Sequence, residues 1–326
     1  MRQITYLQAI REGFAAGMRR DNGSFIVGEG IAVRGGCFGH TKGLYEEFGA
    51  ERVLDLPISE ASFVGMCAAA AACGSRAVVD LMYLDFSTLV MDQLVNQATK
   101  FRYISGGQFT MPLTLSAVFG AQGSAGCHHS QSLYPWFVYA PGIKVVIPST
   151  PYDVKGLLAS AVVDDNPVVV LEHRALLGRK GDVPEEDYFL PIGEAAVLRE
   201  GRDVTVLSSG LMVSHALQAA AMLAEKGVSA EVIDLRTIWP LDEKTIIESL
   251  KKTLKLVVVD EGHAPCGIGA EITALVQEKA FDYLDAPVAR VHTAHVPIPF
   301  APELERFVLP NAEKVVQAVL AMQTRW

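Results

Sequence analysis

Short runs of β-branched and aliphatic residues alternate with longer segments of helical spacing along the whole chain. In the first half, six runs are too continuously apolar to have one face in water, so they predict buried strands of a parallel sheet. These runs are residues 24–29, 52–56, 77–82, 112–118, 143–148 and 167–173. The segments between them predict helices over residues 5–19, 59–73, 86–102 and 151–163. Ser59 and Asp85 stand where two of these helices should have their N-caps. The alternation predicts an α/β fold with helices on both faces of the sheet.

The regular pattern stops between Arg174 and about Gly193, where charged residues, glycine and proline predict a linker. A second α/β unit follows. Its expected strands are residues 203–209, 229–235, 254–260 and 288–293, and its expected helices lie near residues 212–226, 242–252, 267–280 and 311–323. We therefore expect two domains, residues 1–185 and 186–326, and the length of 326 residues favours the same number.

Composition narrows the class of protein. Half of the residues are hydrophobic and the mean hydropathy is +0.25, so we expect a globular chain that buries further apolar surface in an oligomer. The net charge of −9 repels phosphate groups, and we expect neither nucleic acid nor a membrane as a partner. The longest apolar helix candidate, residues 61–75, is too short to span a bilayer and contains two glycines.

The five cysteines indicate the compartment. They are odd in number, widely spaced and without a CxxC pair, which favours reduced thiols and argues against a disulfide framework or a zinc site. The first residues predict an amphipathic helix and lack the pattern of a signal or transit peptide. We expect a cytoplasmic protein.

The segment 103–143 contains no Asp, Glu, Lys or Arg. A surface loop rarely avoids charge over such a length, and the glycines and prolines exclude a membrane helix. We expect this segment to be buried in protein, against a partner chain or around a cofactor.

Glu60 is the first candidate for chemistry. It follows the strand at 52–56 and begins an apolar helix, which places a carboxylate at the carboxyl end of a parallel strand, where open α/β sheets bind ligands. One interpretation is structural: Ser59 caps the helix and Glu60 complements the helix dipole. The other is a carboxylate in a dry pocket, with a raised pKa, that shares a proton with a cofactor nitrogen.

The adjacent pair His128 and His129, within the uncharged segment, is the second candidate. Neighbouring histidines point in different directions and no further ligand stands at suitable spacing, so a metal site is not expected. One of the two can exchange protons near neutral pH, and the alternative is a hydrogen-bonded structural histidine.

Glycine-rich pieces at 28–30, 35–39 and 267–269 raise a nicotinamide-binding alternative. None of them forms a complete G-x-G-x-x-G between a strand and a helix, so this alternative is weak. The sequence also lacks a GxxxxGK[ST] loop and a G-x-S-x-G elbow, which removes kinase-like and hydrolase interpretations.

Several long blocks together resemble a known family. They are residues 28–65 (GEGIAVRGGCFGHTKGLYEEFGAERVLDLPISEASFVG), 85–107, 128–137 (HHSQSLYPWF), 140–158, 164–173 and 231–242 (EVIDLRTIWPLD). In this order and spacing they resemble the β subunit of the thiamine-diphosphate-dependent first component of the pyruvate, branched-chain 2-oxo acid and acetoin dehydrogenase complexes. The resemblance covers essentially the whole chain. It implies a transketolase-type pyrimidine-binding domain, with a parallel sheet, followed by a transketolase C-terminal α/β domain.

The resemblance also implies roles for particular residues. Glu60 matches the glutamate that hydrogen-bonds the aminopyrimidine nitrogen of thiamine diphosphate and so promotes loss of the thiazolium proton. His129 matches a histidine that assists later proton transfers and the reductive acylation of the lipoyl group. Phe86 matches an aromatic residue beside the aminopyrimidine, and Glu29 matches a second acid near the cofactor. Some relatives have a potassium site at the positions of Leu113, Ala161, Asp164 and Asn166.

The partners follow from the same resemblance. Thiamine enzymes hold the diphosphate through Mg²⁺ on a GDG motif, and this sequence has none. The resemblance therefore implies that an α subunit holds Mg²⁺ and the diphosphate, that two α and two β chains assemble, and that a lipoyl-bearing acyltransferase receives the product. The chain alone should be inactive.

The sequence departs from the family around the cofactor. Ser116, Asp80, Cys127 and His128 replace residues that are more usual there, which leaves the substrate open among pyruvate, branched-chain 2-oxo acids and acetoin. A different class of function, a non-catalytic paralogue that only supports assembly, also stays open. The presence of both Glu60 and His129 argues against it.

Overall fold

The computed structural model describes residues 1–323, which form two compact units. The first unit contains Met1–Phe119 and Trp136–Ile192, and the second contains Gly120–Pro135 and the chain from Gly193 onward. The segment that carries the adjacent histidines therefore belongs to the second unit. Within residues 1–323, no helix combines the length and the hydropathy that crossing a membrane requires.

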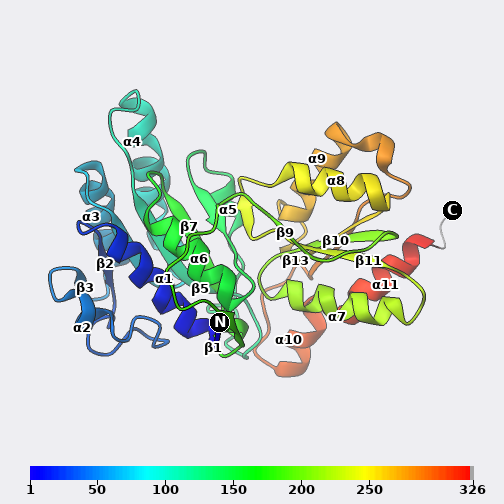
Figure 1. Cartoon of the computed structure of the whole chain (residues 1–326), viewed down its shortest axis with the longest axis horizontal. Coiled ribbons are helices and arrows are strands. Elements are labelled where there is room, and N and C mark those ends of the chain that lie inside the picture. The colour runs from blue at the N-terminus through cyan, green and yellow to red at the C-terminus, as the bar shows by residue number, and fades with distance from the viewer. Residues whose placement is uncertain (324–326) are drawn as a thin grey trace. The chain divides into compact units, whose positions relative to one another are not determined.

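The first unit is built on a parallel sheet (Figure 1). Within this unit the strand order is β6 (Lys144–Val146), β7 (Val168–His173), β5 (Leu113–Phe119), β4 (Ala77–Tyr83), β2 (Phe25–Gly28) and β3 (Val53–Asp55). The residues of β5 and β7 are all buried, as their mainly apolar runs predict. All six strands predicted for the first half are confirmed, with ends shifted by at most two residues.

Helices α1 (Tyr6–Arg20) and α6 (Pro151–Val162) pack side by side in this unit (Figure 1). Helix α1 begins with a capping box, in which the Thr5 hydroxyl accepts the Gln8 N–H and the Gln8 side chain accepts the Thr5 N–H. The two helices approach closely because Gly17 has no side chain: a Cβ there would lie 2.5 Å from Val162 Cβ. Helix α3 (Glu60–Ala72) packs against β4.

Two predictions about helices need correction. The helix expected over 86–102 consists of a 3₁₀ helix, η1 (Leu84–Leu89), a π-helix, η2 (Asp92–Ala98), and α4 (Thr99–Ile104). Asp85 is inside η1 and does not cap it, because Tyr83 occupies the N-cap position. Ser59 is the N-cap residue of α3, but its hydroxyl donates to the Pro57 carbonyl (2.9 Å) and so does not cap the helix.

The expected linker at 174–193 is also wrong. Strand β8 (Lys180–Val183) in this segment pairs antiparallel with β1 (Arg2–Thr5), which places Arg2 opposite Val183. Farther on, the Tyr188 ring stacks on Tyr152, with centroids 4.8 Å apart. The segment is an ordered part of the first unit, and its charge and glycine content reflect a short ribbon at the surface.

The second unit has a five-stranded sheet (Figure 1). Its order is β14 (Ala289–Thr293), β13 (Leu256–His263), β10 (Val204–Ser208), β11 (Ala230–Asp234) and β9 (Ala196–Arg199). The four strands predicted here are confirmed. The antiparallel strand β9 was not predicted, because it has only four residues and none of them is buried.

Helices cover both faces of this second sheet (Figure 1). One face carries α8 (Glu243–Thr253) and α9 (Ile268–Lys279), and the other carries α7 (Met212–Ala224) and α11 (Ala312–Gln323). The remaining short elements are α2 (Leu44–Phe48), α5 (Pro135–Val138), η3 (Arg174–Leu176), β12 (Thr237–Trp239), η4 (Phe281–Tyr283) and α10 (Pro302–Val308).

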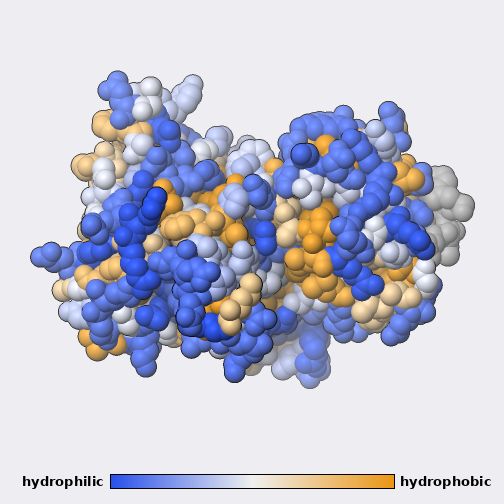
Figure 2. Space-filling view, in the orientation of Figure 1, coloured by the Kyte–Doolittle hydropathy of each residue, from blue (hydrophilic) through white to orange (hydrophobic). Residues whose placement is uncertain are grey.

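The uncharged segment 103–143 is buried only in part. Its middle forms β5, whereas Tyr103 and Ile104 are 85% and 69% exposed and Tyr139 is 91% exposed on the single chain. Apolar side chains are visible near α4 in Figure 2. The expected burial is therefore found only for part of the segment in the single chain, and cover of the rest by a partner chain or a cofactor stays a prediction.

Candidate active site

Two acidic side chains, Glu29 and Glu60, lie at the carboxyl ends of adjacent parallel strands. Glu29 directly follows β2, and Glu60 begins α3 after β3, which is the neighbour of β2 in the sheet. The Asp55 carboxylate accepts the Gly30 N–H (2.6 Å) and so ties together the chain segments that leave these two strands. The fold thus brings the two predicted acids to one edge of the sheet.

The two carboxylates influence each other. Burial raises the pKa of Glu29, and the negative charges of Glu60 and then Asp80 raise it further. Both side chains are half-buried, and neither accepts a hydrogen bond from any residue of the described chain, 1–323. Half-buried acids that repel each other and lack a donor are suited to bind a protonated or hydrogen-bonding ligand.

Phe86 belongs to a small aromatic cluster next to β4. Its ring is half-buried and meets the Tyr83 ring edge to face at 6.1 Å, and Tyr83 in turn meets Phe38 at 5.1 Å. The Arg174 guanidinium donates to the Tyr83 hydroxyl (2.9 Å). These contacts can hold the Phe86 ring in place as a flat apolar surface.

A buried polar network, which the sequence analysis did not find, lies at the same end of the sheet. His40 Nε2 is 3.0 Å from Asp80 Oδ2, and both side chains are almost fully buried. In the neighbouring strands, Ser116 donates to Glu172 Oε1 (2.8 Å), while Glu172 Oε2 has no partner among residues 1–323. The available signal was a charged residue within an otherwise apolar strand, as in VVDLM and VVVLEH.

Burial sets the protonation of this network. It raises the pKa of Glu172 to about 8, against the opposing effects of the Ser116 hydroxyl and of His40. Burial alone would lower the pKa of His40, but the charge of Asp80 and its hydrogen bond raise it overall. At neutral pH, the protonated form of Glu172 is therefore favoured.

His129 lies in the second unit, in the segment Gly120–Pro135. It is half-buried, and its N–H donates to the Gly126 carbonyl (3.3 Å) in a turn. The preceding residue, His128, is exposed, with its Nδ1 3.5 Å from Cys127 Sγ. Of the adjacent histidines, only His129 thus has a partly enclosed position.

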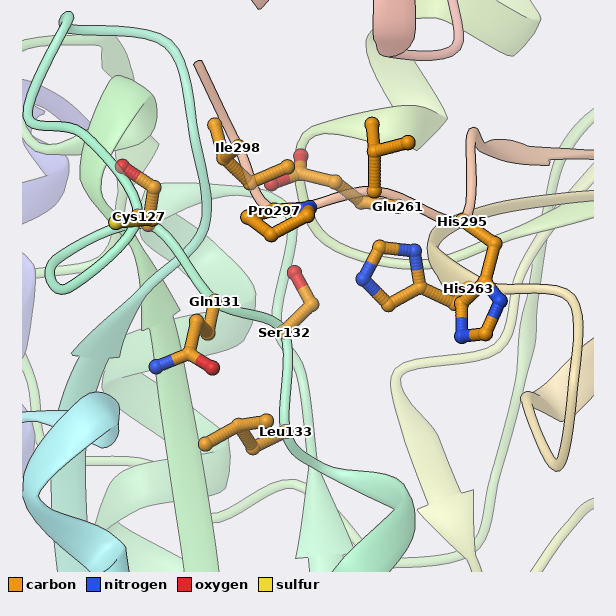
Figure 3. Close-up of a pocket in the computed structure, with 11 residues that line it drawn as sticks. Cys127, Gln131, Ser132, Leu133, Glu261, His263, His295, Pro297 and Ile298 are labelled. Carbon is orange, nitrogen blue, oxygen red and sulfur yellow. The ribbon is translucent and has the colours of Figure 1, made fainter. Parts of the chain in front are cut away.

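The residues after His129 line a pocket of about 790 Å³, including its open mouth (Figure 3). His263 and His295 lie together on one side with rings 5.3 Å apart, and Cys127 and Gln131 lie on the opposite side. In the part of the chain that the structure describes, His263 Nδ1 and the buried Ser130 hydroxyl have no hydrogen-bond partner. The pocket offers hydrogen-bonding groups and contains no lysine or arginine among its lining residues.

The candidate potassium ligands belong to the first unit, and three of their oxygens already accept hydrogen bonds. Arg76 donates to the Asp164 carbonyl (2.8 Å), Arg102 donates to Asn166 Oδ1 (2.5 Å), and the Asp164 N–H donates to the Ala161 carbonyl (3.2 Å). Two guanidinium groups therefore donate to Asp164 and Asn166 at this place, and their positive charge opposes a cation there; the potassium site stays a prediction. Among residues 1–323, no cluster of three or more His, Cys, Asp or Glu side chains is arranged to hold a metal.

Two family descriptions match the chain. Residues 2–180 match the transketolase pyrimidine binding domain, and residues 193–315 match the transketolase C-terminal domain. The predicted fold class is confirmed by these matches and by the structure.

Curated relatives match over nearly the full length. The chain is 44% identical to the acetoin:2,6-dichlorophenolindophenol oxidoreductase subunit beta of Bacillus subtilis, with 98% of this chain and 97% of that protein covered. It is 44% identical to the pyruvate dehydrogenase E1 component subunit beta of Rickettsia felis, with 97% of each chain covered. It is 42% identical to the 2-oxoisovalerate dehydrogenase subunit beta of Bacillus subtilis, with 98% of each covered.

Among solved structures, the chain is similar in fold to a split-gene transketolase, described as an inactive beta4 tetramer. The TM-score is 0.80 at 21% identity, and 98% of each chain is covered. The resemblance found in the sequence blocks is confirmed by these comparisons. The chain belongs to the transketolase family, among its members that are β subunits of acetoin, pyruvate and 2-oxoisovalerate dehydrogenases.

Proposed function

We propose that this chain is the β subunit of a thiamine-diphosphate-dependent 2-oxo acid or acetoin dehydrogenase and supplies the aminopyrimidine half of the cofactor site. The single observation that carries the proposal is the pair Glu29 and Glu60, two half-buried and mutually repelling carboxylates with no donor from the described chain. A heterocycle with a protonable ring nitrogen supplies the missing donor, so these residues fit the cofactor.

Bound thiamine diphosphate supplies a carbon nucleophile that adds to the substrate carbonyl. The Glu60 carboxyl holds a proton at the aminopyrimidine ring nitrogen and so controls which of its nitrogens can accept another. Glu29 is a second acid of the site, and its pKa is raised by burial and by the charge of Glu60, which favours its protonated form. The Phe86 ring packs beside the heterocycle and excludes water.

His129 acts on the substrate side. Its imidazole can donate and accept a proton near neutral pH, which the transfer of an acyl group to a lipoyl thiol requires. The acyl acceptor in this proposal is the lipoyl group of an acyltransferase component.

The diphosphate end needs another chain. Because this sequence has no GDG motif, we assign Mg²⁺ and the diphosphate to an α subunit, in an assembly of two α and two β chains. Potassium has no part in the proposal, since Arg76 and Arg102 already donate to Asp164 and Asn166 at its candidate site. The domain division at residue 185 stays a prediction, which limited proteolysis of the chain would test.

The test is Glu60→Gln in the chain co-expressed with its α partner. Gln retains the shape of Glu60 but cannot share the proton, so we expect turnover to fall at least about 100-fold. The matched control is Glu51→Gln, because Glu51 is an exposed acid shortly before β3. Acetoin, pyruvate and 2-oxoisovalerate are assayed with 2,6-dichlorophenolindophenol as electron acceptor. Parent-like turnover in Glu60→Gln would exclude the catalytic assignment and favour the assembly-only alternative.

A further inference from the structure

The segment that carries His129 is attached to the second unit by three carboxylates from distant parts of the sequence. Asp260 and Glu261 belong to β13, and Glu305 belongs to α10. All three side chains are at least nine-tenths buried. Each accepts a hydrogen bond from the segment Gly120–Pro135, so the acids fix this segment at both of its ends.

Glu305 makes the largest set of these contacts. Its carboxylate accepts the backbone N–H groups of Gln122 (3.1 Å), Gly123 (3.3 Å) and Ser124 (3.3 Å to each oxygen). Consecutive N–H groups that converge in this way form an anion-binding nest. The Glu305 side chain is only 4% exposed. The three backbone N–H groups therefore compensate the cost of burying its charge.

The nest needs an unusual backbone. Gln122 has a φ of +69° and Ser124 a φ of +50°, values that a residue with a side chain adopts at a cost of about 1 kcal/mol or more. Such a conformation persists only where the surroundings favour it. Here the hydrogen bonds to the Glu305 carboxylate stabilise the positive φ values of Gln122 and Ser124.

The other two acids hold the flanks. Glu261 Oε1 accepts the Ala121 N–H (2.6 Å), and Asp260 Oδ2 accepts the Tyr134 hydroxyl (2.5 Å). Ala121 also packs in a buried cluster with Ile298, Val308 and Leu309. Between these anchors the chain turns at Gly126, whose carbonyl accepts the His129 N–H.

We propose that Glu305 is a positioning residue for His129, which it orients by holding the backbone of residues 122–124 in the left-handed nest. The role rests on the proposed function, because it acts through the proton transfers assigned to His129. A shift of about 1 Å in a reacting group can reduce a rate about 100-fold, so a carboxylate that never touches the substrate can still control the rate.

The first test compares Glu305→Gln with Glu303→Gln in the assembled enzyme. Glu303 is an exposed acid on the same helix and forms an ion pair with Arg306 (3.3 Å). Gln at position 305 directs an amide NH₂ at the nest and removes the negative charge. We expect kcat for acyl transfer to lipoamide to fall roughly 10- to 100-fold with little change in KM for the substrate, and Glu303→Gln to match the parent.

The second test separates positioning from stability. If Glu305 acts through His129, then Glu305→Gln should lower kcat much less in a His129→Ala background, because both substitutions remove the action of the same histidine. Ser124→Gly should restore part of the activity to Glu305→Gln, since glycine adopts a positive φ without strain. If Glu305→Gln alone does not fold, Glu305→Asp with Ser124→Gly is compared with Glu305→Asp in the same assay.

A readout without turnover completes the design. Hydrogen exchange of the amides of residues 121–129 in the full chain should speed up in Glu305→Gln and remain as in the parent for Glu303→Gln. Parent-like kcat in Glu305→Gln, or fully additive losses in the double variant, would overturn the proposal. The proposed function fails separately, if Glu60→Gln retains parent-like turnover whatever happens at position 305.

Discussion

His40 Nε2 lies 3.0 Å from Asp80 Oδ2 in the interior of the first unit, below the carboxyl ends of the strands that present Glu29 and Glu60. Asp80 Oδ1 also accepts the Met82 N–H (3.1 Å), at a residue whose φ is +68°. One buried carboxylate therefore holds both an imidazole and a strained backbone turn.

Asp80→Asn should be strongly destabilising. Removing one partner of a buried charge pair costs about 3–5 kcal/mol, because the other partner stays buried without compensation. Urea unfolding of the single chain measures this loss. In a His40→Asn background the loss from Asp80→Asn should be smaller, and strictly additive losses would contradict the direct coupling of the two residues.

The stability of the chain should depend on Glu172 between pH 5 and 9. The folded pKa of Glu172 is about 8 and lies above its ordinary value of 4.5, so the folded state holds this proton more tightly than the unfolded state. The contribution is complete below about pH 4.5 and is lost as the pH rises through 8. Glu172→Gln has no such proton, so the parent should lose on the order of 4 kcal/mol relative to the variant over this range. The comparison is made by urea unfolding at several pH values, and a constant difference between the two proteins would contradict it.

Close packing of α1 on α6 predicts a second stability effect. In Gly17→Ala, the new Cβ would lie 2.5 Å from Val162 Cβ, so the helices must separate. We expect a loss of about 1–3 kcal/mol in the free energy of unfolding. Gly178→Ala is the control, because nothing lies within 4 Å of its added Cβ. Equal midpoints for the two variants would show that α1 can shift without cost.

Potassium should not stabilise the chain. Arg76 and Arg102 already donate to Asp164 and Asn166, so a potassium ion would have to displace them. Thermal unfolding should have the same midpoint in KCl and in NaCl at equal ionic strength, since only an ion that binds the folded state shifts it. A thermal midpoint that rises in KCl but not in NaCl would show that potassium displaces the guanidinium groups of Arg76 and Arg102.

The sequence predicted well what depends on local pattern. The mainly apolar runs of β5 and β7 located two strands of the sheet, and the position of Glu60 after β3 predicted its place near the carboxyl end of that strand. It could not predict contacts between distant residues, such as His40 with Asp80, because these depend on the direction of each side chain in the fold. The π-helix η2 was missed for a related reason, since its residues have helical spacing and only packing decides the type of helix.

The local sequence pattern also could not predict that residues 120–135 belong to the second unit. Its acid partners lie more than 100 residues farther along the chain, at Glu261 and Glu305. The absence of charge did indicate that this segment was unusual, and His129 was identified there as a candidate. The residues on either side of the segment did not indicate which unit it would join.

The pairing of β1 with β8 has a consequence for synthesis on the ribosome. Residues 2–5 find their strand partner only when residues 180–183 have emerged, so β1 must wait until nearly the whole first unit is made before its place in that unit exists. A chain released before that point would expose the unpaired edge of its first strand and invite aggregation.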